Sequence, residues 1–299
     1  MKSLMLRLFF LFVFTTPVFG ETEVLAGKIW DVNKQAFISF TDLRDQAADA
    51  RFIVLGERHG RHAIQNREAF LIGALAEQQI YPTIALEMLT HAETKIVRAY
   101  RQHSPEYSLR LALDLNWSEN NWPAWNFYHP IFDMAFAAKL KLVGADLTDT
   151  EKEALNSSAA PLPDQDDPRF KHYKASMIKA HCGLIDEERA NDLARLQMAR
   201  DQSMAKTLME NEDPDFGAIL IAGASHASKP TGVPFYLPAK STLTIYLFET
   251  EQSLYAFDPE TFNNDHLKGF DILWFTPKVQ SESICDRLAP ASQNASQNE

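Results

Sequence analysis

The stretch FIVLGERHGRHAIQNREAFL, residues 52–71, changes character halfway along. It begins within an apolar run, residues 51–56, that ends at a glycine. Such a run is typical of a strand buried on both faces. The next six residues bring one acid, two histidines and two arginines, and helical spacing follows. The stretch predicts a buried strand, a sharp turn and a helix, with Glu57, His59 and His62 packed at the turn.

Strand and helix patterns alternate along the rest of the chain. Further short apolar runs, each predicted as a strand, are 83–87, 141–146, 218–223, 242–248 and 270–275. The helical stretches are 61–79, 91–103, 125–139, 172–182 and 186–211. This alternation predicts an α/β fold, a three-layer α/β/α sandwich around a mainly parallel sheet. Ahead of it, residues 25–50 predict a short extended pair turning at Asn33 and Lys34, then a helix capped near Thr41.

The N-terminus predicts export. Residues 1–20 place Lys2 and Arg7 before an apolar stretch that is too short to span a membrane, the pattern of a cleavable signal peptide. Its removal moves the formal charge from −11 to −13, and such acidity argues against nucleic acid and anionic membranes as partners. We expect a periplasmic protein without stable membrane insertion after cleavage. Residues 21–288 are predicted as a single domain and 289–299 as a disordered tail.

Two cysteines, Cys182 and Cys285, leave one question open. An oxidising compartment permits a disulfide between them, but their separation in sequence does not show whether they meet. Two cysteines cannot form the spaced pairs of a structural zinc site. Residues 156–168, rich in proline and aspartate, predict a loop or lid.

Polar side chains gather at the predicted strand ends. Glu57 and His59 follow the first run, Glu87 closes the second, Asp146 closes the third, and His226 follows the fourth. Because functional groups in such sheets lie beyond the carboxyl ends of the strands, we expect these side chains to share one cavity. The pattern G-x-x-H occurs at two of these ends, where the glycine lets the chain turn out of the sheet.

Three interpretations fit this group of residues. It could hold a metal or a haem iron, supply a general base with its orienting partner, or form a buried polar network. Glu87 is flanked by apolar residues and needs a partner, because burying an unpaired carboxylate is costly. Either Arg58 or Arg61 is a structural partner, or Glu87 faces the same centre as His59 and His226.

Two further segments carry candidate ligands. Residues 120–136 begin a helix with dense aromatics that could be core or cofactor wall: Trp122, Trp125, Phe127, Tyr128 and His129. The phenolate of Tyr128, or of Tyr173 as a rival, could ligate ferric iron, although losing its proton requires the metal or a nearby cation. On the helix 186–211, Arg200 interrupts an apolar stripe as either a buried ion-pair member or an anion clamp.

Six segments, in order, resemble a known family. They are VLGERH, IALEML, WPAWNFYHPIFDMA, HCGLIDEER, LQMARDQSMA and IAGASHASKPTGVPFYL. They are similar to the ChaN-like haem-binding proteins, which are related to the Tiki and TraB proteins and more distantly to erythromycin esterases. The resemblance covers roughly residues 25–250. It implies an α/β/α sandwich, a place in bacterial haem and iron acquisition, and dimerisation that contributes to the haem site. Gly60 departs from the family, which commonly has aspartate there, and the leader lacks a lipid-bearing cysteine.

The leading hypothesis is therefore a periplasmic haem-binding protein acting in iron acquisition or haem handling, and forming a homodimer. The predicted haem contacts are Tyr128, then Tyr173, as iron ligand, with His62, His129 and Arg200, the last as a propionate partner. The alternative is a metal-dependent hydrolase with zinc, manganese or cobalt held by Glu57, His59, Glu87 and His226. Glu57 and Glu87 would then be the candidate catalytic residues. A third alternative is an interaction module that binds neither haem nor metal.

Overall fold

The computed structural model describes residues 24–100, 107–156, 161–260, 267–280 and 285. These residues form an eight-stranded sheet in the order β2-β1-β8-β7-β3-β6-β4-β5. The strands are β1 (Ile29–Asp31), β2 (Ala36–Ile38), β3 (Phe52–Glu57), β4 (Thr83–Thr90), β5 (Leu142–Asp146), β6 (Ala218–Gly223), β7 (Thr242–Thr250) and β8 (Ile272–Pro277). The run from β8 to β5 is parallel, and β1 pairs antiparallel with β8 and β2.

Helices connect the strands. They are α1 (Phe40–Asp49), α2 (His62–Glu77), α3 (Thr94–Tyr100), α4 (Ser108–Asp114), α5 (Trp125–Ala137), α6 (Asp149–Leu155), α7 (Pro168–Ala180) and α8 (Glu187–Asn211). Short 3₁₀ segments are η1 (His91–Glu93), η3 (Trp117–Glu119), η4 (Val233–Tyr236), η5 (Ala239–Ser241), η6 (Leu254–Ala256) and η7 (Leu267–Gly269).

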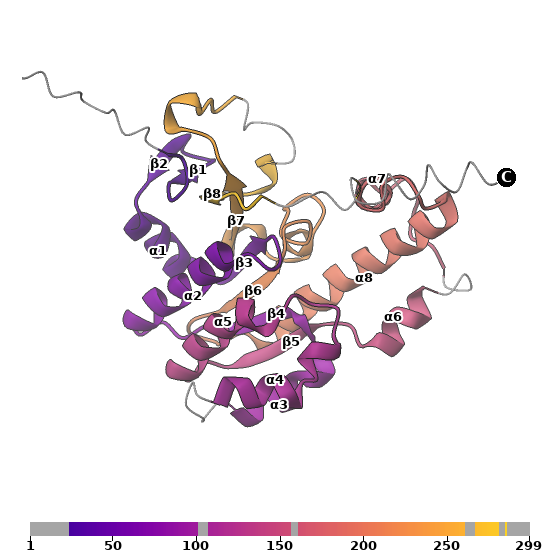
Figure 1. Cartoon of the computed structure of the whole chain (residues 1–299), viewed down its shortest axis with the longest axis horizontal. Coiled ribbons are helices and arrows are strands. Elements are labelled where there is room, and N and C mark those ends of the chain that lie inside the picture. The colour runs from indigo at the N-terminus through magenta and orange to yellow at the C-terminus, as the bar shows by residue number, and fades with distance from the viewer. Residues whose placement is uncertain (1–23, 101–106, 157–160, 261–266, 281–284, 286–299) are drawn as a thin grey trace, which may run out of the picture.

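Two cores lie on opposite faces of the sheet. On β3, Ile53 and Leu55 pack into the core shared with α1, α2 and α5, whereas Phe52 and Val54 pack into the core that contains Met204 of α8. Because successive side chains of a strand point to opposite faces, both faces of β3 must be apolar. Each fully buried aliphatic side chain contributes about 1.5–3 kcal/mol. The predicted three-layer α/β/α fold is confirmed (Figure 1).

Several predicted boundaries were wrong. The first helix is capped at Ser39, not near Thr41, because Ser39 and Asp42 form a reciprocal capping box. The helix predicted over 91–103 is a 3₁₀ turn followed by α3, and residues 101–103 lie outside the described part of the chain. The second predicted strand continues past Glu87 to the end of β4.

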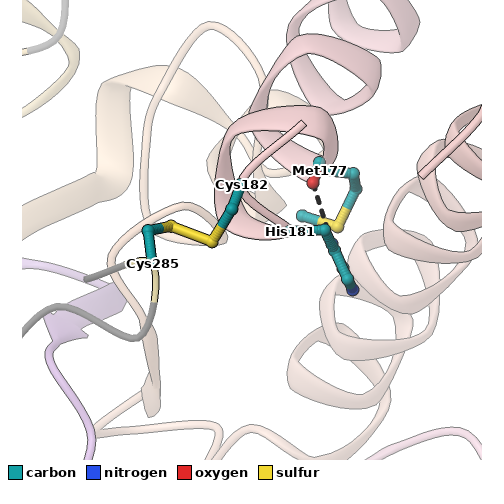
Figure 2. Close-up of a disulfide and its surroundings, with 4 residues drawn as sticks. All are labelled: Met177, His181, Cys182 and Cys285. Atoms are coloured by element: carbon teal, nitrogen blue, oxygen red, sulfur yellow. Dashed lines mark hydrogen bonds between the residues drawn. A yellow bond between two sulfur atoms is a disulfide. The ribbon is translucent and has the colours of Figure 1, made fainter. Parts of the chain in front are cut away.

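Cys182 and Cys285 form a disulfide (Figure 2). Cys182 follows α7 and Cys285 follows β8, so the bond ties the α7 end to the C-terminal part of the chain. The helix α7 packs on α8 through a small core of its own, formed by Phe170, Tyr173, Ala194 and Met198. Figure 1 shows the α7–α8 pair toward one end of the molecule and α1 and α2 toward the other.

Parts of the predicted organisation lie beyond the described residues. Residues 1–20 and 289–299 are both outside them. Within the loop predicted over 156–168, residues 161–167 form no helix or strand and 157–160 are not described. Among the helices of the described part of the chain, none is long and apolar enough to cross a membrane.

Candidate functional site

The sheet order brings three strand ends together. The strand β6 lies between β3 and β4, and Glu57 at the end of β3 pairs in register with Gly223 at the end of β6. Glu87 comes from β4, and His226 lies just beyond β6. The structure therefore brings Glu57, His59, Glu87 and His226 into one cluster, because parallel strands end at the same edge of the sheet.

His59 is held between two carboxylates. Its Nδ1 lies 2.5 Å from Oε1 of Glu57, and its Nε2 lies 3.8 Å from Oε2 of Glu87. Oε1 of Glu57 also accepts a hydrogen bond of 2.8 Å from the hydroxyl of Tyr128. Burial alone would lower the pKa of His59, but the hydrogen bond to Glu57 and the charge of Glu87 outweigh it and raise that pKa.

His226 repeats this arrangement on the other side of Glu87. Its Nε2 lies 3.5 Å from Oε1 of Glu87, and its Nδ1 lies 2.6 Å from Oδ1 of Asp201. The other oxygen of Asp201 accepts a 2.5 Å hydrogen bond from the hydroxyl of Tyr173. Two carboxylate–histidine pairs, each backed by a tyrosine, therefore flank Glu87.

An irregularity in β4 points Glu87 into this cluster. Leu86 pairs with Gly144 of β5, yet the next pair joins Thr90 to Asp146, so β4 carries extra residues between them. Within the irregular segment, Oε2 of Glu87 accepts a 2.6 Å hydrogen bond from the backbone N–H of Gly223. Gly144 permits it, because a Cβ there would lie 1.9 Å from the carbonyl oxygen of Thr90.

Arg200 is the partner that Glu87 requires. Its Nη2 donates to Oε1 of Glu87 at 2.7 Å, and its Nε and Nη2 donate to the two oxygens of Asp146 at 2.9 and 3.0 Å. The side chain is 12% exposed, so Arg200 is a buried ion-pair member. Burial would raise the pKa of Glu87, but His226 and Arg200 hold it well below its usual value.

The alternative partners of Glu87 lie elsewhere. Arg58 and Arg61 both bind Glu249, at 3.0 and 3.1 Å. Glu87 thus faces the centre shared with His59 and His226, as the second of the two predictions had it.

The two predicted tyrosine ligands are buried and already hydrogen-bonded. Tyr128 and Tyr173 are both 0% exposed. Burial, together with the neighbouring charges of Glu57 and Asp201, raises the pKa of each phenol. In this arrangement the two phenols are protonated donors to carboxylates, and a phenolate bond to iron would require each to give up that contact.

Two predicted haem contacts lie outside the cluster. His62 is exposed at the start of α2 and its ring lies 4.3 Å from that of Phe127. His129 is 44% exposed, and its Nδ1 lies 3.0 Å from the carboxylate of Asp133 on the same helix. His62 thus packs against α5 and His129 pairs within α5, so neither touches the cluster, and their contact with haem stays a prediction.

A cavity of about 600 Å³ lies beside the cluster. The residues lining it are Met88, Thr90, Glu93, Glu119, Asn120, Asn121, Trp122, Asp146, Thr148, Asp149, Lys152, Leu196 and Arg200. The ring of Trp122 also meets the ring of His59 edge-on, at 5.0 Å. The His59 side chain is 29% exposed, against 0% for Glu57, 3% for Glu87 and 4% for His226. His59 is therefore the member of the four that a ligand can reach.

Three polar residues of the site were missed as members of the cluster. Gln65 donates to Oε2 of Glu57 at 2.5 Å, Asp201 binds His226, and Glu68 is fully buried behind Glu57. Helical spacing could have found them. Gln65 and Glu68 lie on the buried stripe of α2, and Asp201 lies on the buried stripe of α8. A polar residue on such a stripe needs a partner.

A comparison with protein families identifies the chain. The model of a family described as "Haem-binding uptake, Tiki superfamily, ChaN" matches residues 43–237. The chain belongs to this ChaN family. The match contains both carboxylate–histidine pairs and Arg200, and the resemblance expected from the sequence is confirmed.

A comparison with solved structures found several that are similar to this chain. The chain is similar to ChaN of Campylobacter jejuni, whose structure shows cofacial haem binding. The two are 24% identical with a TM-score of 0.64, and the match covers 82% of this chain and 95% of that one. An erythromycin esterase mutant, EreC, is 14% identical with a TM-score of 0.47, covering 86% and 99%. The type III effector HopBA1 is 14% identical with a TM-score of 0.46, covering 79% and 92%. No curated protein matches the chain.

The backbone at position 60 favours glycine over the aspartate that the sequence resemblance led us to expect. Gly60 has a φ of +70°, where glycine is favoured, and a Cβ there would lie 2.9 Å from Cβ of Pro123. An aspartate could not occupy this turn without displacing the chain around Pro123.

The alternative with zinc, manganese or cobalt is not supported. Within the described ranges, no group of three or more histidine, cysteine, aspartate or glutamate side chains could hold a metal ion. Both carboxylate oxygens of Glu57 and of Glu87 already accept hydrogen bonds from groups of the protein, and the guanidinium of Arg200 neutralises Glu87. A divalent cation would be repelled by this guanidinium. Arg200 also lines the cavity, and its role as a haem propionate partner stays a prediction.

The residues present do fit the haem of the ChaN family. Imidazole is a common haem-iron ligand, and a carboxylate on its other nitrogen fixes the orientation of the ring. His59 has this form, with Glu57 on Nδ1 and no hydrogen bond from Nε2 to any described group at ordinary distance. Haem would supply an iron centre at this edge of the sheet.

Proposed function

We propose that the protein binds haem at the carboxyl end of its sheet and that Nε2 of His59 faces the iron. Membership of the ChaN family supports haem as the ligand. The exposure of His59 next to Trp122 is the observation that carries the assignment. We prefer His59 to Tyr128 and Tyr173 because imidazole ligates iron without leaving a carboxylate unpaired in the core.

Each neighbour then has a defined part. Glu57 accepts a hydrogen bond from the Nδ1–H of His59, and the lone pair of the ring is then on Nε2. Trp122 offers an apolar ring at the cavity wall. The ion pair of Arg200 and Glu87 joins the middle of α8 to β4, and Glu87 lies 3.8 Å from Nε2 of His59.

Hemin titration followed by the visible spectrum tests the proposal. We expect His59→Ala to weaken hemin binding at least about tenfold and to shift the Soret band, since it removes the proposed ligand. Tyr128→Phe should leave the band position unchanged. If Tyr128→Phe shifts the band and His59→Ala does not, the ligand is Tyr128.

Acid should weaken binding at the same site. A proton competes with iron for Nε2, and the pKa of His59 is raised by Glu57 and Glu87 despite burial. Hemin affinity should therefore be highest above that raised pKa and should fall as the pH drops through it. A stopped-flow or equilibrium titration across pH 5 to 9 measures this, and affinity that rises on acidification contradicts it.

We further propose that the protein is periplasmic, acts in iron acquisition or haem handling, and forms a homodimer. The signal-peptide pattern of residues 1–20 and the disulfide support an oxidising compartment. Cell fractionation with N-terminal sequencing should give a mature chain that starts near Glu21. Light scattering with and without hemin measures the assembly, and a monomer under both conditions would contradict the homodimer.

A further inference from the structure

A second cavity lies where α1 and α2 meet the antiparallel end of the sheet. It has a volume of about 630 Å³, and its lining contains the aromatic residues Phe40, Phe70 and Trp274 and the polar residues Ser39, Asn66 and Arg67. It shares no lining residue with the cavity beside the carboxylate–histidine cluster. In Figure 1, α1 and α2 lie toward the end of the molecule away from the α7–α8 pair. The second cavity is therefore separate from the candidate haem site.

Three aromatic rings form a wall of this second cavity. The ring centroid of Phe40 lies 4.6 Å from that of Phe70 and 5.7 Å from that of Trp274. Trp274 is buried, whereas Phe70 is 57% exposed and leaves part of the wall uncovered. A Cβ at Gly27, another lining residue, would meet no atom within 4 Å, so the space there is open. Such a wall suits a flat aromatic group, because aromatic rings pack well in offset or edge-to-face contacts.

Arg67 is the cation of this cavity and has no acidic partner among the described residues. Its Nη1 donates to the carbonyl oxygen of Ala63 at 2.9 Å, and its Cζ lies 5.9 Å from the ring centroid of Trp274. Arg51 and Arg58, by contrast, each pair with a glutamate. Burial lowers the pKa of Arg67, and no neighbouring acid offsets this effect. Because a guanidinium carries five N–H donors, Arg67 can still donate to a ligand.

The charge of the second cavity favours an anion. Among the described residues that line it, none is an aspartate or a glutamate, although the chain has a formal net charge of −11. The planar guanidinium of arginine binds a carboxylate through two parallel hydrogen bonds. One monoanion balances the single cation, whereas a dianion such as a phosphate monoester would add net negative charge to an acidic protein. A monocarboxylate therefore fits this cavity best.

We propose that this cavity binds an organic monocarboxylate with a flat aromatic body. The carboxylate accepts two hydrogen bonds from the guanidinium of Arg67, and the aromatic body packs against Phe40, Phe70 and Trp274. Binding is non-covalent and involves no residue of the carboxylate–histidine cluster. The site is thus independent of the proposed function, and haem-free protein is the material on which to test it.

NMR titration of the haem-free full chain with cinnamate tests the proposal. We expect Arg67→Gln to weaken cinnamate binding at least about tenfold, since it removes a charge-assisted pair. Arg189→Gln removes an exposed arginine of α8 that lines neither cavity, and this control should keep the wild-type affinity. The uncharged analogue cinnamamide should bind the wild type at least about tenfold more weakly than cinnamate. Equal affinity of the wild type and Arg67→Gln for cinnamate, or no binding to the wild type, overturns the proposal.

The same titration shows where the probe binds. Cinnamate should shift the indole N–H signal of Trp274 and leave that of Trp122, at the other cavity, in place. Phe70→Ala, at an exposed position that the fold tolerates, should also weaken binding. Thermal unfolding of Arg67→Gln at the wild-type temperature shows that a loss of binding is local. A shift of Trp122 without Trp274 overturns the site, and tighter binding of phenyl phosphate than of cinnamate overturns the ligand class.

Discussion

At the scale of single residues, Glu87 is the carboxylate that balances the charge of Arg200 and lies next to both histidines of the site. Its carboxylate meets Arg200 at 2.7 Å and lies between the outer nitrogens of His59 and His226. Because it is 2% exposed, the loss of its charge leaves Arg200 buried with one acid fewer. Removing one partner of a buried ion pair destabilises the fold by more than the intact pair stabilises it, because the remaining charge is buried without a partner.

We expect Glu87→Gln to lower the free energy of unfolding by about 3–5 kcal/mol at pH 7. His226 and Arg200 outweigh burial and hold the folded-state pKa of Glu87 below its reference value of 4.5. The wild type therefore loses this advantage as the pH falls below about 4.5, because the unfolded chain takes up the proton first. Urea unfolding at several pH values measures the difference in the free energy of unfolding between the wild type and Glu87→Gln. Glu251→Gln, from an exposed pair with Lys278, is the control and should change little. If this difference did not change with pH, it would contradict the lowered pKa of Glu87 in the folded state.

The residues of the site could be predicted only in part from the sequence. The convergence of Glu57, His59, Glu87 and His226 follows from the rule that parallel strands end at one edge. The partner of Glu87 could not be predicted, since Arg200 lies 113 residues away and the distance in space depends on the strand order. The exposure of each side chain could not be predicted either: Tyr128 is fully buried, whereas the side chain of His59 is 29% exposed. Which of the two ligates a haem iron stays a prediction.

At the scale of elements, the irregular segment of β4 sets the site geometry. It inserts extra residues opposite Gly144 and turns Glu87 toward β6. The sequence predicted a strand that ends at Glu87, because an apolar run gives no sign of inserted residues. Helix starts were predicted to within a few residues, and the error at α1 arose because both Ser39 and Thr41 are good caps.

Gly144→Ala should destabilise the protein by about 1–3 kcal/mol or more and weaken hemin binding, since its Cβ would collide with the carbonyl of Thr90 and force β4 to shift. Gly73→Ala is the matched control. The Cβ at that helical position would meet only the flexible end of Met134, and alanine favours the helix, so stability should stay equal or rise. Thermal unfolding of both variants measures the difference. Equal stability of the two variants would show that β4 is not under this constraint.

At the scale of the whole molecule, the disulfide closes a loop of about one third of the chain. Cys182 and Cys285 are separated by 103 residues, and the bond restricts the unfolded chain. Removing it with Cys182→Ser and Cys285→Ser should lower the free energy of unfolding by about 2–4 kcal/mol. Guanidinium unfolding measures this, with the reduced wild type as the control. If the reduced wild type and the double variant are both as stable as the oxidised protein, the bond adds nothing. Sequence spacing could not show this pairing, because it depends on where α7 lies relative to β8.

The position of β3 in the sheet also bears on how the chain folds during synthesis. This early strand, residues 52–57, sits between β6 and β7, which are made more than 150 residues later. Its two neighbours are therefore missing until most of the polypeptide has left the ribosome. Pairings between such distant segments form slowly. Under the export that we propose, this late completion of the sheet would leave the chain unfolded for a secretion channel, which accepts unfolded polypeptide.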